Sequence, residues 1–214
     1  MPQTLGSLLI LLAGMGFGLL IKFISDMLIK KRLKQLMTVS GSIKNQEMIF
    51  FSMTNGLIWW LFFKQYGIES QAASNMLLFS IALMIALVDL KIQKIPNELL
   101  LLEIIIGIGL IISTWPDGDP GIRIAGFVIG FVIFMIPALI GRAAGWGDVK
   151  YAAVVGFCLG IQGLILAILM MSIAVIFYAI IFLVRKREDL KKRIALGPFI
   201  TLGFSMVLVF NLMA

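Results

Sequence analysis

Two aspartates in this 214-residue chain have surroundings that could support catalysis. Asp89 ends a long apolar run in Leu-Val-Asp-Leu-Lys, and Asp148 opens another in Gly-Trp-Gly-Asp-Val-Lys. Burying a charged side chain in lipid is costly, so acidic residues at such positions usually serve a function. Two carboxyls close enough to share a proton do not both ionise readily. The ionised one can take a proton from water while the protonated one polarises a peptide carbonyl, which predicts aspartyl peptidase chemistry.

Each aspartate also fits a structural role when it is considered alone. Asp89 can end a helix among lysines whose long side chains reach the membrane surface. Asp148 follows a glycine and precedes an apolar run, which suits a helix N-cap. The helix macrodipole would favour the anion of Asp148, so we expect Asp148 to be the more readily ionised partner of a pair.

The glycines and the proline near the two aspartates predict turns. Gly145 and Gly147 permit a tight turn and a close approach of the backbone. Pro96 interrupts the backbone, and Asn97 is expected to cap the helix that follows. Both aspartates therefore lie where one element ends and another begins.

Several other chemistries are excluded by the composition. The chain has no histidine, which removes imidazole general bases and histidine metal sites. Its single cysteine, Cys158, lies in an apolar stretch without a partner in the chain, so it cannot build a disulfide framework or a thiolate zinc site. We therefore expect neither a metal nor a cofactor.

Composition predicts an all-α polytopic membrane protein that forms one domain over residues 1–214. Of its residues, 61% are hydrophobic and 14% are charged, whereas about a quarter of the residues of a soluble domain are charged. A helix needs about 20 apolar residues to cross the hydrocarbon layer. We expect about eight spans, over Leu5–Ile24, Met48–Phe63, Ala73–Val88, Glu98–Trp115, Gly121–Ile140, Val149–Gly160, Gly163–Val184 and Ile194–Met213.

The segment from Val149 to Val184 is too long to cross the bilayer as one helix. The glycines in Gly160-Ile-Gln-Gly163 predict a break inside it. A re-entrant sixth segment would leave seven spans instead of eight.

The basic residues predict the orientation of the spans. The net charge of +7 lies in short clusters between the apolar runs, where orienting charges belong, so we do not expect nucleic-acid binding. Most of these clusters follow spans one, three, five and seven, and the positive-inside rule places these connections in the cytoplasm and both termini outside. The first connection is a short basic loop over residues 26–46, whose stretch Lys30–Lys34 is expected to contact anionic lipid headgroups.

At these motifs the sequence resembles the type IV prepilin peptidases and their preflagellin-processing relatives, which are Gly-x-Gly-Asp membrane aspartyl peptidases. The resemblance rests on Asp89 with Ile-Pro-Asn after it, on Asp148 in Gly-Trp-Gly-Asp-Val-Lys, and on Leu-Gly-Pro-Phe over residues 196–199. It covers residues 80–204. Gly-x-Gly-Asp alone is shared with presenilin-like proteases, and the upstream aspartate with its proline makes the resemblance specific.

The resemblance implies that Asp89 and Asp148 are the catalytic pair of an endopeptidase of a prokaryotic cell membrane. Members of the family remove short basic leader peptides from prepilin-like precursors on the cytoplasmic side. Residues that bind substrate or position the loop are expected at Gly145, Gly147, Lys150, Pro96 and Asn97. Lys150 would position the loop or a substrate carboxyl group, or it extends to the membrane surface from a helix end.

The chain departs from many bacterial members of that family. They carry a cysteine-bearing cytoplasmic domain between the first two spans, linked to N-methylation with S-adenosylmethionine, whereas this interval is short and free of cysteine. A compact member with peptidase activity alone is therefore expected. Two other classes remain open, namely an ion- or proton-coupled transporter that uses the same aspartates, and a catalytically silent assembly factor of a pilus or secretion system.

Overall fold

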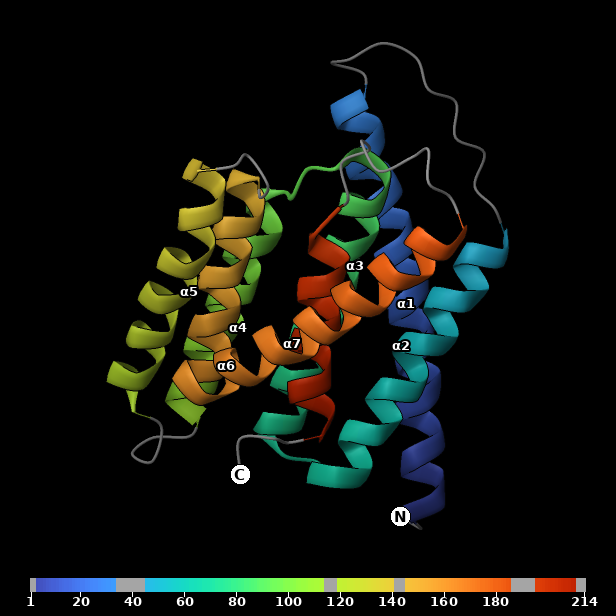
Figure 1. Cartoon of the computed structure of the whole chain (residues 1–214). Coiled ribbons are helices and arrows are strands. Elements are labelled where there is room, and N and C mark those ends of the chain that lie inside the picture. Colours follow the sequence, from blue (N-terminus) through green and yellow to red (C-terminus); the bar gives the residue numbers. More distant parts are fainter. Residues whose placement is uncertain (1–2, 34–44, 114–118, 141–144, 186–194, 211–214) are drawn as a thin grey trace.

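The computed structural model describes residues 3–33, 45–113, 119–140, 145–185 and 195–210, and these ranges contain helices and no strand (Figure 1). The helices are α1 (Gln3–Leu33), α2 (Asn45–Tyr66), α3 (Ser70–Ile92), α4 (Asn97–Ser113), α5 (Pro120–Ile140), α6 (Trp146–Arg185) and α7 (Gly197–Phe210). The expected all-α fold is confirmed.

Four stretches of helix are long and apolar enough to cross a membrane: Leu5–Lys31, Ser70–Ile92, Pro120–Ile140 and Trp146–Ile181. The protein is therefore an all-α membrane protein, but the expected count of about eight spans is not reached by this measure. The helices α4 and α7 have 17 and 14 residues, fewer than the roughly 20 that a full crossing needs. The helix α2 is less apolar, with Thr54 and Asn55 in its middle.

The break predicted at Gly160–Gly163 is confirmed inside α6. Gly160 has φ 71° and ψ −175°, a conformation that is essentially restricted to glycine. The helix turns back at this point: its first part descends beside α4 and α5, and its second part rises obliquely across the bundle (Figure 1). A helix end leaves carbonyl groups without partners, and the guanidinium group of Arg123 in α5 donates a hydrogen bond to one of them, the carbonyl of Cys158.

The first helix extends further than the sequence suggested. A loop was expected over residues 26–46, but α1 continues to Leu33 and α2 begins at Asn45; residues 34–44 lie outside the described part. Lys22, only 1% exposed, forms an ion pair with Asp26 one turn later at 2.6 Å. Lys91 of α3 lies 2.8 Å from Glu47 of α2 and 3.7 Å from Asp26, so charged pairs hold this end of α1 as a helix against its neighbours.

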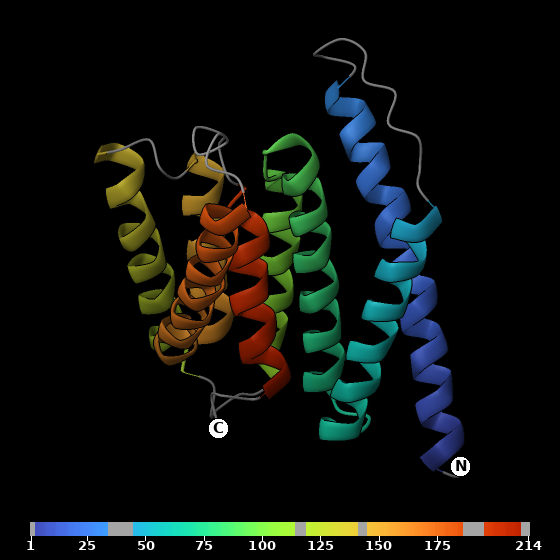
Figure 2. The same ribbon diagram turned by 45° about the vertical axis from the view of Figure 1, so that its right-hand side comes forward.

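The helices place the two aspartate motifs at one end of the molecule. In Figures 1 and 2, α1, α3 and α5 end, and α2, α4, α6 and α7 begin, at the upper end. The helix α1 begins and α7 ends at the opposite end. Asp89 lies in the last turn of α3 and Asp148 in the first turn of α6, so both belong to the upper end.

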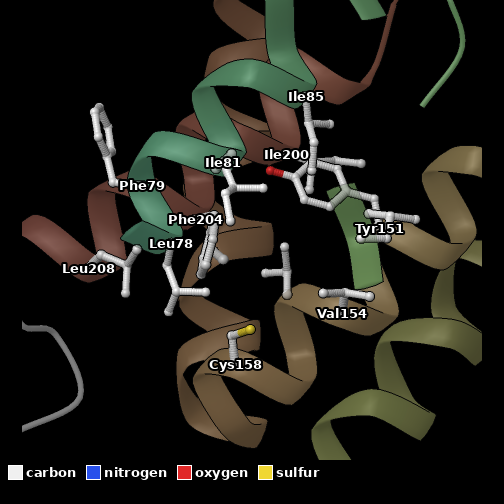
Figure 3. Packing of buried hydrophobic residues seen from close by; sticks show 14 of the residues in the cluster. Leu78, Phe79, Ile81, Ile85, Tyr151, Val154, Cys158, Ile200, Phe204 and Leu208 are labelled. Atoms are coloured by element: carbon white, nitrogen blue, oxygen red, sulfur yellow. The ribbon is translucent and has the colours of Figure 1, made fainter. Parts of the chain in front are cut away.

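The core lies between α3 and α6. Both α4 and α7 pack against α3 and against α6. Figure 3 shows the apolar side chains that fill this space, among them Ile85 of α3, Tyr151 of α6 and Phe204 of α7. The position of Asp89 relative to Asp148 therefore depends on how α4 and α7 join the two helices.

Candidate active site

Asp89 is a buried carboxyl at the end of α3, with 4% of the residue exposed. Its carbonyl accepts a hydrogen bond at 2.8 Å from the N–H of Gln93. Gln93 ends the helix with a left-handed φ of 51°, a conformation seen after many helices. The chain therefore leaves α3 one turn after Asp89, which brings the following Ile-Pro-Asn close to the carboxyl.

The Asp89 carboxyl is held by a residue far away in the sequence. Oδ2 accepts a hydrogen bond at 2.9 Å from the backbone N–H of Gly197, the first residue of α7. The first N–H groups of a helix lack intrahelical partners and carry a partial positive charge. A Cβ atom on Gly197 would lie 2.7 Å from Oδ2, so only glycine leaves room for the carboxyl here.

Asp148 is held within its own turn. Its Oδ2 accepts a hydrogen bond at 2.8 Å from the N–H of Gly145, and its own N–H donates to the Gly145 carbonyl at 3.0 Å. The first bond is the half of a capping box in which the side chain of the third helical residue accepts the N–H of the N-cap residue, and the second joins the two backbones. The expectation that Asp148 itself is the N-cap is therefore wrong: α6 begins at Trp146, so Gly145 holds the N-cap position and Asp148 is the third residue of the helix.

The structure brings both motifs to one pocket of about 360 Å³. The carboxyls of Asp89 and Asp148 both line it and are close enough to interact electrostatically. The remaining lining residues are Gln93, Lys94, Ile95, Asn97, Gly145, Trp146, Gly147 and Lys150. The pocket thus includes each residue expected from the sequence except Pro96, which is buried next to it.

The two motifs also contact each other directly. Gly147 lies against Ile95, and a Cβ atom on Gly147 would be 3.2 Å from the Ile95 Cβ. The Lys150 ammonium group donates to the Asn97 side-chain oxygen at 3.3 Å. Asn97 does not cap α4 as expected: it is the first residue of the helix, and its side chain bridges to α6 instead. The N–H groups of Leu99 and Leu100 donate to the carbonyl of Pro96, the residue before the helix.

Sequence reasoning did not single out several residues that complete this region. Gly197 binds Asp89, and Ile95 and Trp146 line the pocket. Tyr151 and Thr201, both buried, form a hydrogen bond at 2.8 Å between α6 and α7. The Leu-Gly-Pro-Phe motif was a signal for Gly197, but nothing in the sequence pairs it with Asp89.

Glu103 is a third acidic side chain, and it lies inside the apolar run of α4. It is fully buried, and neither carboxyl oxygen has a hydrogen-bond partner in the described part of the chain. An unpaired charge in such surroundings is very costly, which favours the neutral form of the Glu103 side chain. An acidic residue within a predicted span was a signal that could have identified it.

The described ranges contain no group of three or more Cys, Asp or Glu side chains that could hold a metal ion.

The geometry defines a class of protein, a helical membrane protein with two carboxyls in one pocket at the end of its bundle. Residues 76–180, which carry both aspartates, match the type IV leader peptidase family. This match supports the family expected from the two aspartate motifs, and that family implies a protease. No curated protein and no solved structure matches the chain.

Proposed function

We propose that the protein is a membrane aspartyl endopeptidase that removes the short basic leader of prepilin-like precursors. The observation that supports this most is that Asp89 and Asp148 line the same pocket from different helices, within a segment that matches the type IV leader peptidase family. Both carboxyls already accept backbone hydrogen bonds, so little reorganisation is needed for them to act together.

The proposed reaction needs one proton shared by the pair. The ionised carboxyl takes a proton from a water molecule, whose oxygen attacks the peptide carbonyl carbon, while the protonated carboxyl donates to the carbonyl oxygen. Collapse of the tetrahedral intermediate then returns a proton to the leaving amine. Asp148 is the more exposed of the two, so its anion loses less hydration, which supports the expectation that it ionises more readily.

The location of the pocket fits a cut just before a hydrophobic helix. The pocket lies at the end of the bundle, where α3 ends and α6 begins. A precursor whose apolar helix lies in the bilayer would present the residues before that helix at the same level. Lys91, Lys94 and Lys150 lie at this end, and under the positive-inside rule it faces the cytoplasm of a prokaryotic cell.

The two parts of α6 support the topology that we propose. With the fold-back at Gly160, the described chain has eight helical segments that alternate in direction (Figure 2). We infer that each of them crosses or nearly crosses the bilayer, with the termini on the side opposite the pocket. Reaction of single cysteines introduced near Lys94 with a membrane-impermeant reagent only after cell permeabilisation would support this orientation, and reaction in intact cells would overturn it.

The test of the function is leader removal in membranes. The chain is expressed with a prepilin-like precursor, and the shortening of the precursor is followed on a gel for the parent, Asp89→Asn and Asp148→Asn. Each amide keeps the shape of the carboxyl but cannot transfer its proton, so both variants should lose cleavage at normal membrane levels. Asp119→Asn is the matched control, because Asp119 also accepts a backbone N–H, that of Gly121, outside the pocket. Parent-like cleavage by both pocket variants would overturn the proposal.

A second candidate function is supported by Glu103. Intramembrane carboxyls often carry protons or ions through transporters, and Glu103 is buried without a partner in the described structure. A transporter would lose proton flux in liposomes when Glu103 is changed to Gln. The peptidase should instead cleave at close to the parent rate in Glu103→Gln, because the amide keeps the shape of a side chain that does not line the pocket.

A further inference from the structure

A chain of buried hydrogen bonds joins the three helices that determine the pair. The Tyr151 hydroxyl of α6 lies 2.8 Å from Thr201 Oγ1 of α7, and Thr201 Oγ1 donates to the Ala82 carbonyl of α3 at 3.1 Å. Tyr151 is fully buried and Thr201 is 5% exposed. Figure 3 shows the Tyr151 ring with its hydroxyl directed away from α6, toward the side chains of Ile85 and Ile200.

The direction of these bonds follows from the number of protons. Thr201 has one hydroxyl proton, and it goes to the Ala82 carbonyl. Thr201 must then accept the bond from Tyr151, so the Tyr151 hydroxyl is the donor. One oxygen atom, Thr201 Oγ1, is therefore the joint between α6 and α3.

The bond between Tyr151 and Thr201 lies about one helical turn after Asp148 in α6 and about one turn after Gly197 in α7. Tyr151 is three residues after Asp148, about 4.5 Å along the helix, and Thr201 is four residues after Gly197, about 6 Å. Gly197 in turn binds the Asp89 carboxyl. Movement of α7 relative to α6 would therefore carry Asp89 and its anchor away from Asp148.

The surroundings of the joint favour a single arrangement. Most neighbours of Tyr151 and Thr201 are apolar, including Ile85, Ile200 and Phe204, although the carboxyls of Glu103 and Asp89 lie close enough to Tyr151 to interact electrostatically. In such an interior an unpaired hydroxyl or carbonyl is costly, and a satisfied network fixes one packing. Apolar packing alone would tolerate small sliding of one helix along another, whereas these two bonds specify the register.

We propose that Tyr151 and Thr201 are positioning residues that set the separation of the Asp89 and Asp148 carboxyls. The effect of these residues on catalysis rests on the proposed peptidase function. Their role in setting the separation of the two carboxyls does not depend on it. Neither side chain lines the pocket, so both act through the helices and not on the substrate.

The kinetic test compares Thr201→Val with Thr201→Ser. Valine keeps the shape but removes both bonds, and a displacement near 1 Å lowers the rate about a hundredfold. We expect kcat to fall about tenfold to hundredfold in Thr201→Val at nearly unchanged KM, and Thr201→Ser to retain the parent kcat. Equal kcat values for both variants and the parent would overturn the proposal.

The chain offers a matched control in Ser80. Its buried hydroxyl accepts a bond from Trp59 at 2.9 Å, and its one proton has two acceptors, the Asn55 side-chain oxygen at 2.9 Å and the Met76 carbonyl of α3 at 2.7 Å. Ser80 therefore joins α2 to α3 without involving α6 or α7. Ser80→Ala therefore removes a comparable buried polar joint. We expect it to lower thermal stability while leaving kcat at the parent value once the folded fraction is measured.

The two positioning residues act in series, which gives a sharper test. Tyr151→Phe breaks the bond to α6, and Thr201→Val breaks that bond together with the one to α3. Because either change opens the same chain, the double variant should be no slower than the slower single variant. Multiplied effects would mean that the two residues act independently, and this result would overturn the proposal.

A distance measurement tests the proposal without cleavage. Spin labels are placed on Lys94→Cys, which follows α3, and Trp146→Cys, which begins α6, after the sole native cysteine is removed by Cys158→Ala; both positions line the pocket. We expect a broader or longer distance distribution in Thr201→Val and Tyr151→Phe than in Ser80→Ala. Unchanged distributions would overturn the positioning role even if Asp89→Asn and Asp148→Asn abolish cleavage. Changed distributions in a protein that cleaves no precursor would support the positioning role and count against the proposed function.

Discussion

The two aspartates of the pocket are held in different ways. Asp148 accepts its hydrogen bond from Gly145, three residues earlier in the same turn. Asp89 accepts its bond from Gly197, which is 108 residues later in the chain. Asp148 is partly exposed, whereas Asp89 is 4% exposed. One carboxyl is thus positioned by local backbone geometry and the other by the assembly of the bundle.

This difference indicates which changes the site should tolerate. A local cap can adjust when its own turn shifts, because donor and acceptor move together. The bond from Gly197 to Asp89 joins α7 to α3. These two helices pack against each other, so neither can move without disturbing that packing. Glycine substitutions in the two halves of the site should therefore have unequal effects.

The largest effect is expected from Gly197→Ala. The new methyl group would lie 2.7 Å from Asp89 Oδ2 and 2.9 Å from its Cγ, so the carboxyl or the start of α7 must move. We expect leader cleavage to fall about a hundredfold or more, measured as initial rate per folded protein. The matched control is Gly109→Ala in α4, where an added Cβ meets no atom within 4 Å. A parent-like rate in Gly197→Ala would contradict the proposed role of this anchor.

An intermediate effect is expected from Gly147→Ala. Its Cβ would meet Ile95 Cβ at 3.2 Å, which forces the two motifs apart by a few tenths of an ångström. The rate of cleavage should fall about tenfold, with a smaller loss of stability than in Gly197→Ala. A loss of the same size as in Gly197→Ala would show that contact between the motifs matters as much as the α7 anchor does.

A smaller effect is expected from Gly145→Ala. The nearest atom to its new Cβ would be Asp148 Oδ2 at 3.2 Å, and little else lies nearby because the residue is exposed. The N–H that binds Asp148 remains, so cleavage should fall by only about twofold to fivefold. The comparison between the two anchors fails if Gly145→Ala is as inactive as Gly197→Ala.

The smallest effect on kcat is expected from Lys150→Met and Asn97→Ala. Their mutual bond is exposed and long, at 3.3 Å, and exposed pairs of this kind contribute little to stability. If Lys150 only bridges the motifs, both variants should behave alike, with less than about a threefold change. A rise in KM that is confined to Lys150→Met would instead indicate that its ammonium group binds a substrate carboxyl.

The same contrast explains what could be predicted from the sequence. The turn before Asp148 and the break at Gly160 depend on nearby residues, and glycine spacing was enough to locate both. The contact of Asp89 with Gly197 depends on how α3 and α7 pack, and one sequence has no periodic signal for that. The Tyr151–Thr201 bond was missed for the same reason, since hydroxyls in apolar spans often bond within their own helix.

Two errors of prediction also have a physical cause. Charged residues after Ile24 suggested a loop, but the ion pair between Lys22 and Asp26 and the contacts with Lys91 stabilise a longer helix. Asn97 was expected to cap α4, but it lies inside the helix as its first residue, and its side chain accepts a bond from Lys150 of α6. In both cases partners on other helices determined the local structure.

The most direct test of the account is whether the two carboxyls act as one unit. Initial rates of leader cleavage are measured for the purified parent, Asp89→Asn, Asp148→Asn and the double variant, at matched folded protein. Catalytic groups that act as a unit are not additive, so all three variants should fall to the same residual rate. A double variant that is slower than either single variant by the product of the two effects would show that the aspartates act independently, and it would contradict the shared-proton pair.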